Sequence, residues 1–141
     1  MSFAGINYFA VVIAAIAGFM VGGVWYGALF SERWMRAAGL TMEDIRPEGR
    51  KSGHKGPFFL SGVADLLMAW MLAGIIAHAA GEVSIIKGLL AALFVWLGFV
   101  VTTSSVNNAF QMKPLALTII DSGHWLAVLL VMGAIIGAFG V

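Results

Sequence analysis

Four apolar stretches, each longer than 20 residues, occupy most of this 141-residue chain. They cover approximately residues 6–30, 57–80, 85–106 and 114–139. A helix needs about 20 consecutive apolar residues to cross the hydrocarbon layer of a bilayer, so each stretch is long enough to do so. The strict alternation of apolar and polar residues that is typical of a transmembrane barrel is absent. We therefore predict an all-α integral membrane bundle of four transmembrane helices, forming a single domain over residues 1–141.

The composition agrees with a membrane protein. Hydrophobic residues make up 61% of the chain and charged residues only 11%, whereas a soluble domain typically has about 25% charged residues. The chain has no cysteine, which excludes disulfides, thiolate metal sites and thiol nucleophiles.

Basic residues are distributed unevenly between the two ends of the predicted bundle. Seven of the eight lie in the segments that join the first span to the second and the third to the fourth: Arg33, Arg36, Arg46, Arg50, Lys51, Lys55 and Lys113. Only Lys87 lies on the opposite side. Because cytoplasmic loops hold the excess of Lys and Arg, we predict that both basic loops are cytoplasmic and both termini are periplasmic (N-out/C-out). The chain would then be a multi-pass protein of the bacterial inner (plasma) membrane.

The cytoplasmic loop 31–56 is the only sizeable polar segment. It begins with a short amphipathic helix that Ser31 can cap and that ends near Gly39, with Trp34 at the level of the lipid headgroups. Thr41 and Asp44 form a second capping pattern. The loop is expected to determine topology and to rest on anionic lipid; binding of a nucleotide or phosphate is the alternative.

Three ionisable residues, Asp65, Asp121 and His124, lie inside the apolar stretches. A charge at the centre of a membrane helix costs roughly 2.5–3.5 kcal/mol on insertion scales, so each needs a partner or a function. At 1.5 Å per residue, all three lie roughly 10–15 Å from the cytoplasmic start of their spans. We therefore expect them to share one polar layer in the cytoplasmic half of the bundle, where Asp65 can share a proton with the other two.

The third span ends in a polar run that reaches the same layer. We place four of its residues, Thr103, Ser105, Asn107 and Asn108, with the three ionisable residues in one ligand- or proton-binding set. The alternative is structural, because hydroxyl and amide groups commonly join membrane helices to one another.

Glycines recur at four-residue spacing on two spans. The pairs are Gly18 with Gly22, Gly23 with Gly27, and Gly133 with Gly137. Such spacing lets helix backbones approach closely. The contacts would lie either within the bundle or between copies of the chain.

Signatures of catalysis are missing. The chain has no His-Glu-x-x-His zinc motif, no phosphate-binding glycine loop with lysine and no Gly-x-Ser-x-Gly elbow. We therefore do not expect an enzyme, and we expect no cofactor, no metal site and no nucleic-acid partner.

Several motifs resemble those of a known family. They are Ile6-Asn7-Tyr8, Trp25-Tyr26-Gly27-Ala28-Leu29-Phe30, Trp34-Met35, Thr102-Thr103, Asn107-Asn108-Ala109-Phe110, Ile120-Asp121-Ser122-Gly123-His124 and Val131-Met132-Gly133-Ala134-Ile135. Over nearly the whole chain they resemble domain-of-unknown-function family 1761, a group of small bacterial membrane proteins. In that pattern an acid or amide precedes Gly-Tyr; Asp121 fits, whereas His124 replaces the aromatic residue. The resemblance implies a four-helix membrane protein and no established activity.

Two classes of function remain open. In the first, an oligomeric bundle handles a proton, a cation or a small polar solute, with Asp65 and Asp121 as the titrating groups. In the second, the chain is a non-catalytic accessory or structural subunit of a larger membrane complex. Its partners would be the lipid bilayer and either further copies of itself or unrelated membrane subunits.

Overall fold

The computed structural model of the chain describes residues 5–45, 55–79 and 82–141, and this part is helical without strands. The elements in chain order are α1 (Tyr8–Val24), η1 (Trp25–Leu29), α2 (Ser31–Ala38), α3 (Met42–Ile45), α4 (Lys55–His78), α5 (Ile85–Val95), η3 (Trp96–Val101), α6 (Thr102–Phe110) and α7 (Leu115–Phe139). The two η elements are π-helical turns that continue α1 and α5.

In the part of the chain that the structure describes, four helical segments are long and apolar enough to cross a membrane. They are Tyr8–Leu29, Gly56–His78, Ile85–Phe110 and Leu115–Phe139. The prediction of an all-α bundle with four membrane-spanning helices is confirmed, and the chain is a multi-pass membrane protein. The third helix continues past the expected end at Val106, because backbone bonds such as Gln111 N–H to Asn107 C=O persist to its last turn.

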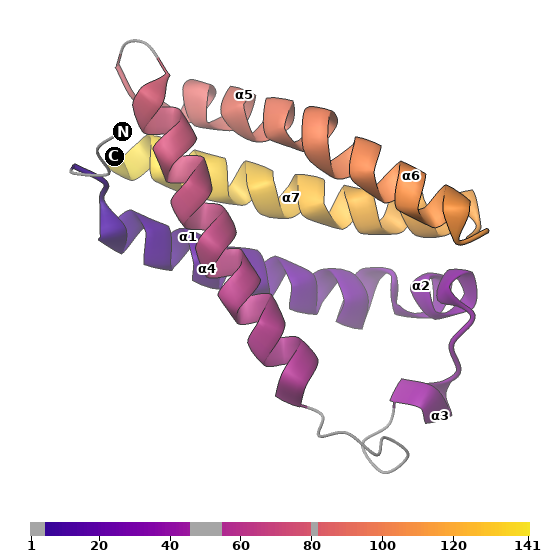
Figure 1. Cartoon of the computed structure of the whole chain (residues 1–141). Helices are drawn as coiled ribbons and strands as arrows, with labels where there is room; N and C mark the ends of the chain where they lie inside the picture. Colours follow the sequence, from indigo (N-terminus) through magenta and orange to yellow (C-terminus); the bar gives the residue numbers. More distant parts are fainter. Residues whose placement is uncertain (1–4, 46–54, 80–81) are drawn as a thin grey trace.

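The helices are arranged around α7. Figure 1 shows α1, α7 and the α5–α6 segment running side by side, while α4 crosses α1 at a steep angle. The end of α4 lies near the start of α5, and its beginning diverges from the other helices toward α3. The divergent end exposes Phe58 and Phe59.

The start of the first helix and the end of the last helix lie on the same side of the bundle. The Asn7 side chain caps α1 by accepting from the Ala10 N–H, and its amide donates to the Phe139 carbonyl at 3.3 Å. The start of α1 and the end of α7 therefore lie together (Figure 1). Their N-out/C-out orientation in the bilayer stays a prediction.

Close contact between α5 and α7 depends on glycine. A Cβ atom added to Gly88 would overlap the Gly133 backbone, and one added to Gly137 would lie 2.5 Å from the Ser84 carbonyl oxygen. The Gly133/Gly137 pair is thus a contact within the bundle. The face of α1 that bears Gly18 and Gly22 likewise packs on α7, whereas Gly23 and Gly27 meet no atom within 4 Å. The core beside these contacts is apolar, with Val128, Leu129, Met132 and Ile136 almost completely buried.

The short loop helices differ in part from expectation. Ser31 is the first residue of α2 and does not cap it, because the N-cap position is occupied by Phe30. The helix does end at Gly39, in the left-handed conformation (φ 74°). Trp34 is half-buried and packs edge-on against Tyr26 at 5.4 Å between ring centroids, so it belongs to the bundle.

The Thr41–Asp44 capping pattern is present at α3. The Thr41 N–H and hydroxyl both donate to the Asp44 carboxylate at 2.7 Å, and the Asp44 N–H donates back to the Thr41 hydroxyl. These bonds from Thr41 lower the pKa of Asp44. Three of the loop's basic residues, Arg46, Arg50 and Lys51, lie outside the described residues.

The glycine contact predicts a selective loss of stability. In Gly133→Ala the new methyl group would overlap the Gly88 carbonyl, and we expect a loss of about 1–3 kcal/mol in the free energy of unfolding. Gly98→Ala is the matched control, because a Cβ atom there meets nothing within 4 Å. Unfolding of both variants by SDS in mixed micelles measures the difference. Equal stability of the two would contradict the contact.

Candidate functional site

A cavity of about 410 Å³ lies between α1, α4 and α7. Its wall consists of small and aromatic residues with a few polar groups: Phe19, Gly22, Gly23, Tyr26, Gly27, Phe58, Ser61, Asp65, His124 and Trp125. Ligand sites typically occupy 300–1,000 Å³ and combine apolar walls with a few convergent polar groups. This cavity meets both criteria and contains two of the three ionisable residues predicted to share a layer.

Asp65 lies on the inner face of α4, among residues that pack in the core. Its side chain is 4% exposed, and Ala69 and Leu72 continue the same buried face. The carboxylate lies against the glycine face of α1, where a Cβ atom on Gly18 would be 3.6 Å from Oδ1. Among the described residues, Asp65 Oδ1 has no hydrogen-bond partner. A buried polar atom without a partner is uncommon in folded proteins and calls for an explanation, such as a bound water or ion or a functional role.

His124 enters the cavity from α7 and is 6% exposed. Neither ring nitrogen has a hydrogen-bond partner within the part of the chain that the structure describes. The ring fits beside α1 because Gly22 has no side chain; a Cβ atom there would lie 3.2 Å from Nε2. Aromatic rings flank the imidazole, with Trp125 at 4.6 Å and Tyr26 at 4.8 Å between centroids.

Asp121, in contrast, is held by the protein. The Tyr26 hydroxyl donates to its Oδ1 at 2.8 Å. Asp121 does not line the cavity. Asp65 and His124 therefore line the cavity together, whereas Asp121 lies outside its lining. Tyr26 touches both His124 and Asp121 and separates the latter from the cavity.

Two tryptophans fix the segment of α7 that bears these residues. The Trp25 indole donates to the Ile120 carbonyl at 3.1 Å, and the Trp96 indole donates to the Ser122 carbonyl at 2.6 Å. Each tryptophan begins a π-helical turn, a feature often found at functional sites. Gly123 leaves room for Trp25, since a Cβ atom there would lie 3.2 Å from the indole.

Sequence reasoning missed these turns. The available signal was a repeat, because Val-Trp-x-Gly occurs at both 24–27 and 95–98. The first copy lies two residues before the end of the Tyr8–Leu29 span, and the second lies near the middle of the Ile85–Phe110 span.

The polar run of α6 lies apart from the cavity. Thr103, Ser105 and Asn107 are exposed, and none of them lines it. Asn108 donates to the Thr118 hydroxyl at 2.9 Å and so joins α6 to α7. The structure therefore does not bring these four residues together with Asp65 and His124.

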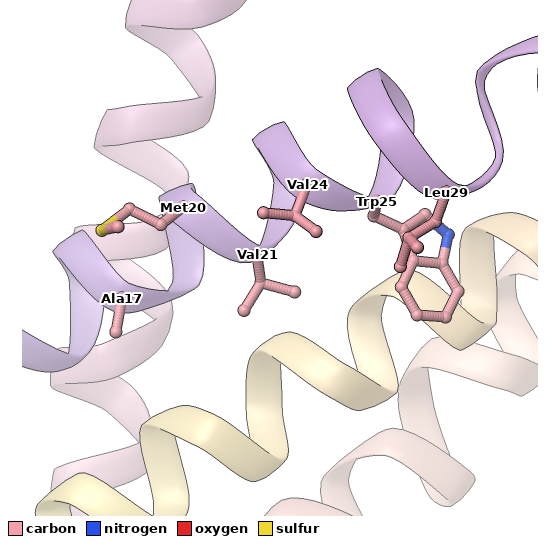
Figure 2. A pocket seen from close by; sticks show the side chains of 6 residues that line it. All are labelled: Ala17, Met20, Val21, Val24, Trp25 and Leu29. Atoms are coloured by element: carbon pink, nitrogen blue, oxygen red, sulfur yellow. The ribbon is translucent and has the colours of Figure 1, made fainter.

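A second hollow, of about 340 Å³, lies on the opposite face of α1. Figure 2 shows its six lining side chains: Ala17, Met20, Val21, Val24, Trp25 and Leu29. All come from one continuous helical segment, and none is ionisable. The polar side-chain group in this hollow is the Trp25 indole N–H, which already donates to the Ile120 carbonyl of α7. In the described part of the chain, the hollow therefore offers no further side-chain group for recognition of a polar ligand. Within the described residues, no three His, Asp or Glu side chains lie close enough to hold a metal ion.

The Tyr26–Asp121 bond predicts a measurable contribution to stability. Tyr26→Phe removes the hydroxyl that joins η1 to α7, and we expect a loss of about 1 kcal/mol in the free energy of unfolding. Tyr8→Phe removes the same group from a side chain that is 57% exposed and should have no effect. SDS titration of the two variants compares them; a larger loss in Tyr8→Phe would refute this role for the phenol.

Comparison with known proteins places the chain in a family. The mouse vesicle transport protein GOT1A is 37% identical over 54 residues, which are 38% of this chain and 41% of that protein. The chain thus spans about two-fifths of the length of the curated relative that it matches. No solved structure matches the chain. A family model described as "Protein of unknown function (DUF1761)" matches residues 9–137, and the chain therefore belongs to the DUF1761 family.

Proposed function

We propose that this membrane protein binds a proton or a small cation at Asp65 and moves it, or a small polar solute with it, across the bilayer. One observation supports the proposal above all others. Asp65 and His124 are 4% and 6% exposed, lack hydrogen-bond partners among the described residues and line the same cavity. An ionisable residue inside a membrane protein is a functional candidate by default.

The other polar groups of the bundle provide an internal comparison. Asp121 accepts a hydrogen bond from the Tyr26 hydroxyl. The Ser122 hydroxyl donates to the Thr118 carbonyl, and the Asn108 amide donates to the Thr118 hydroxyl. A layer that only held helices together would pair its groups in this way, because hydrocarbon offers no water to replace a missing partner. Asp65 and His124 depart from that pattern, and both do so at the cavity.

Asp121 has a different role in this proposal. It holds the Tyr26 phenol against the wall that His124 and Trp125 complete. The titrating role assigned to both aspartates from sequence therefore narrows to Asp65, with Asp121 as a positioning residue. The carbonyl oxygen of an amide at position 121 would still accept a hydrogen bond from the Tyr26 hydroxyl.

The proposal predicts that Asp65→Asn abolishes proton uptake. The purified protein would be reconstituted into liposomes that contain a pH-sensitive dye, and uptake driven by a potassium diffusion potential would be recorded. Asp65→Asn should reduce the protein-dependent rate to background, whereas Asp121→Asn should keep most of it. The exposed Glu32→Gln variant is a control for loss of one acidic group.

A second variant separates function from folding. Gly23→Leu adds bulk to the cavity wall at a position where a Cβ atom meets nothing within 4 Å. It should lower uptake without loss of stability, because it changes no charge and its Cβ atom meets no neighbour within 4 Å. Wild-type rates in Asp65→Asn would refute the proposal. Misfolding of Asp65→Asn together with wild-type rates in Gly23→Leu would show that the carboxyl group is structural.

A role as an accessory subunit is the second candidate, and the surface of the third span supports it. Only 11% of the apolar window of Ile85–Phe110 is buried, compared with 44% for Leu115–Phe139. The exposed side of α6 includes Thr103 and Asn107. Polar groups of this kind commonly bond to a neighbouring membrane helix.

This candidate predicts a dependence of assembly on α6. Thr103→Leu combined with Asn107→Leu should release any partner subunit, or further copies of the chain, from complexes purified gently from membranes. Native mass spectrometry of the intact complex is the measurement, and Phe99→Leu, an exposed apolar change on the same span, is the control. Unchanged assembly in the double variant would refute the docking role of this surface.

A further inference from the structure

The cavity that contains Asp65 continues into an apolar groove between α1 and α4. The groove, of about 560 Å³, shares Phe19 and Phe58 with the cavity, and its other walls are apolar side chains and Gly62. A further hollow of about 490 Å³ shares Val12, Val63 and Leu66 with the groove and extends it to Trp70. From position 58 to position 70, α4 rises about 18 Å. The carboxyl group of Asp65, which lies within this stretch of α4, thus adjoins a long apolar surface.

The cavity beside this apolar surface has the chemistry of a cation site. Among the described residues, Asp65 is the only acidic one that lines the cavity, and no Lys or Arg lines it. Four aromatic residues, Phe19, Tyr26, Phe58 and Trp125, form much of the remaining wall. The faces of aromatic rings attract cations, and cages of such rings recognise quaternary ammonium groups. Hard metal ions require about six oxygen ligands, and this wall does not supply them.

The mouth of the groove lies at the surface of the membrane-spanning region. Phe19 is 41% exposed and Phe58 is 69% exposed, and both belong to segments that can cross the bilayer. The beginning of α4, which includes Phe58, diverges from α1 (Figure 1). A ligand in the lipid could therefore reach Asp65 sideways, between the two helices.

We propose, on the basis of the function proposed above, that the cation is an amphiphilic ammonium compound. Its ammonium head lies at Asp65 among the aromatic rings, and its alkyl chain lies in the groove between α1 and α4. It enters the cavity from the bilayer, past Phe19 and Phe58.

Equilibrium dialysis of the full chain in dodecyl maltoside tests this assignment, with protein-free micelles subtracted. The radiolabelled probes are octyltrimethylammonium, tetramethylammonium (head without chain) and octyl sulfate (chain with the opposite charge). We expect octyltrimethylammonium to bind at one per chain, at least about tenfold more tightly than either of the others, because both head and chain contribute. Asp65→Asn should weaken its binding by about tenfold or more.

A variant in the groove tests whether the alkyl chain of the ligand lies there. Gly62→Leu adds a side chain to the groove at a position where a Cβ atom meets nothing within 4 Å. It should therefore weaken the binding of octyltrimethylammonium and leave the binding of tetramethylammonium unchanged. Gly98→Leu, equally open but on another span, is the matched control.

Three outcomes would overturn the inference: equal binding of octyltrimethylammonium by wild type and Asp65→Asn, equal binding of octyl sulfate, or no effect of Gly62→Leu. If octyltrimethylammonium fails to bind while Asp65→Asn still abolishes proton uptake, the proposed function stands and the ligand class is wrong. If Asp65→Asn changes neither measurement, both proposals are wrong.

Discussion

Close packing on α7 is the constraint on which the rest of the structure depends. Backbone approaches at Gly88 and Gly133 bring α5 against it, and the glycine face of α1 with Gly18 and Gly22 does the same from the other side. Lipid is as apolar as the side chains, so burial alone does not drive membrane helices together, and close van der Waals contact takes its place. Because α7 lies between its neighbours, the residues that it presents determine what the bundle interior contains.

The sequence was sufficient to predict features that depend on local pattern. The four spans and the Thr41–Asp44 cap follow from apolar length and capping spacing. Small-residue spacing marked Gly133 and Gly137 but did not show that their contact lies within the bundle. It was insufficient where residues distant in the chain meet. Tyr26 and Asp121 are 95 positions apart, and no periodicity on either helix indicates which face meets which. Depth alone placed Thr103 and Asn107 with Asp65, but their rotation about the helix axis points them outward.

The buried ionisable residues that the structure describes are of two kinds: those with a hydrogen-bond partner and those without one. Depth in the bilayer made Asp65 and Asp121 equivalent, whereas hydrogen bonding separates them. The phenol of Tyr26 compensates Asp121 for the loss of water, and nothing in the described residues does so for Asp65 Oδ1. For small membrane proteins, the pairing of a buried acid is therefore more informative than its presence in an apolar helix.

The repeated tryptophan bonds have a mechanical consequence. The Trp25 and Trp96 indoles hold α7 at Ile120 and Ser122, on both sides of Asp121. A slide of α7 along its axis by even one residue would break both bonds together. With the glycine contacts, they make α1, α5 and α7 a rigid frame, and α4 takes no part in these bonds. A rotation of α4 relative to these three helices would then widen or narrow the cavity that Asp65 lines, while the three helices keep their register.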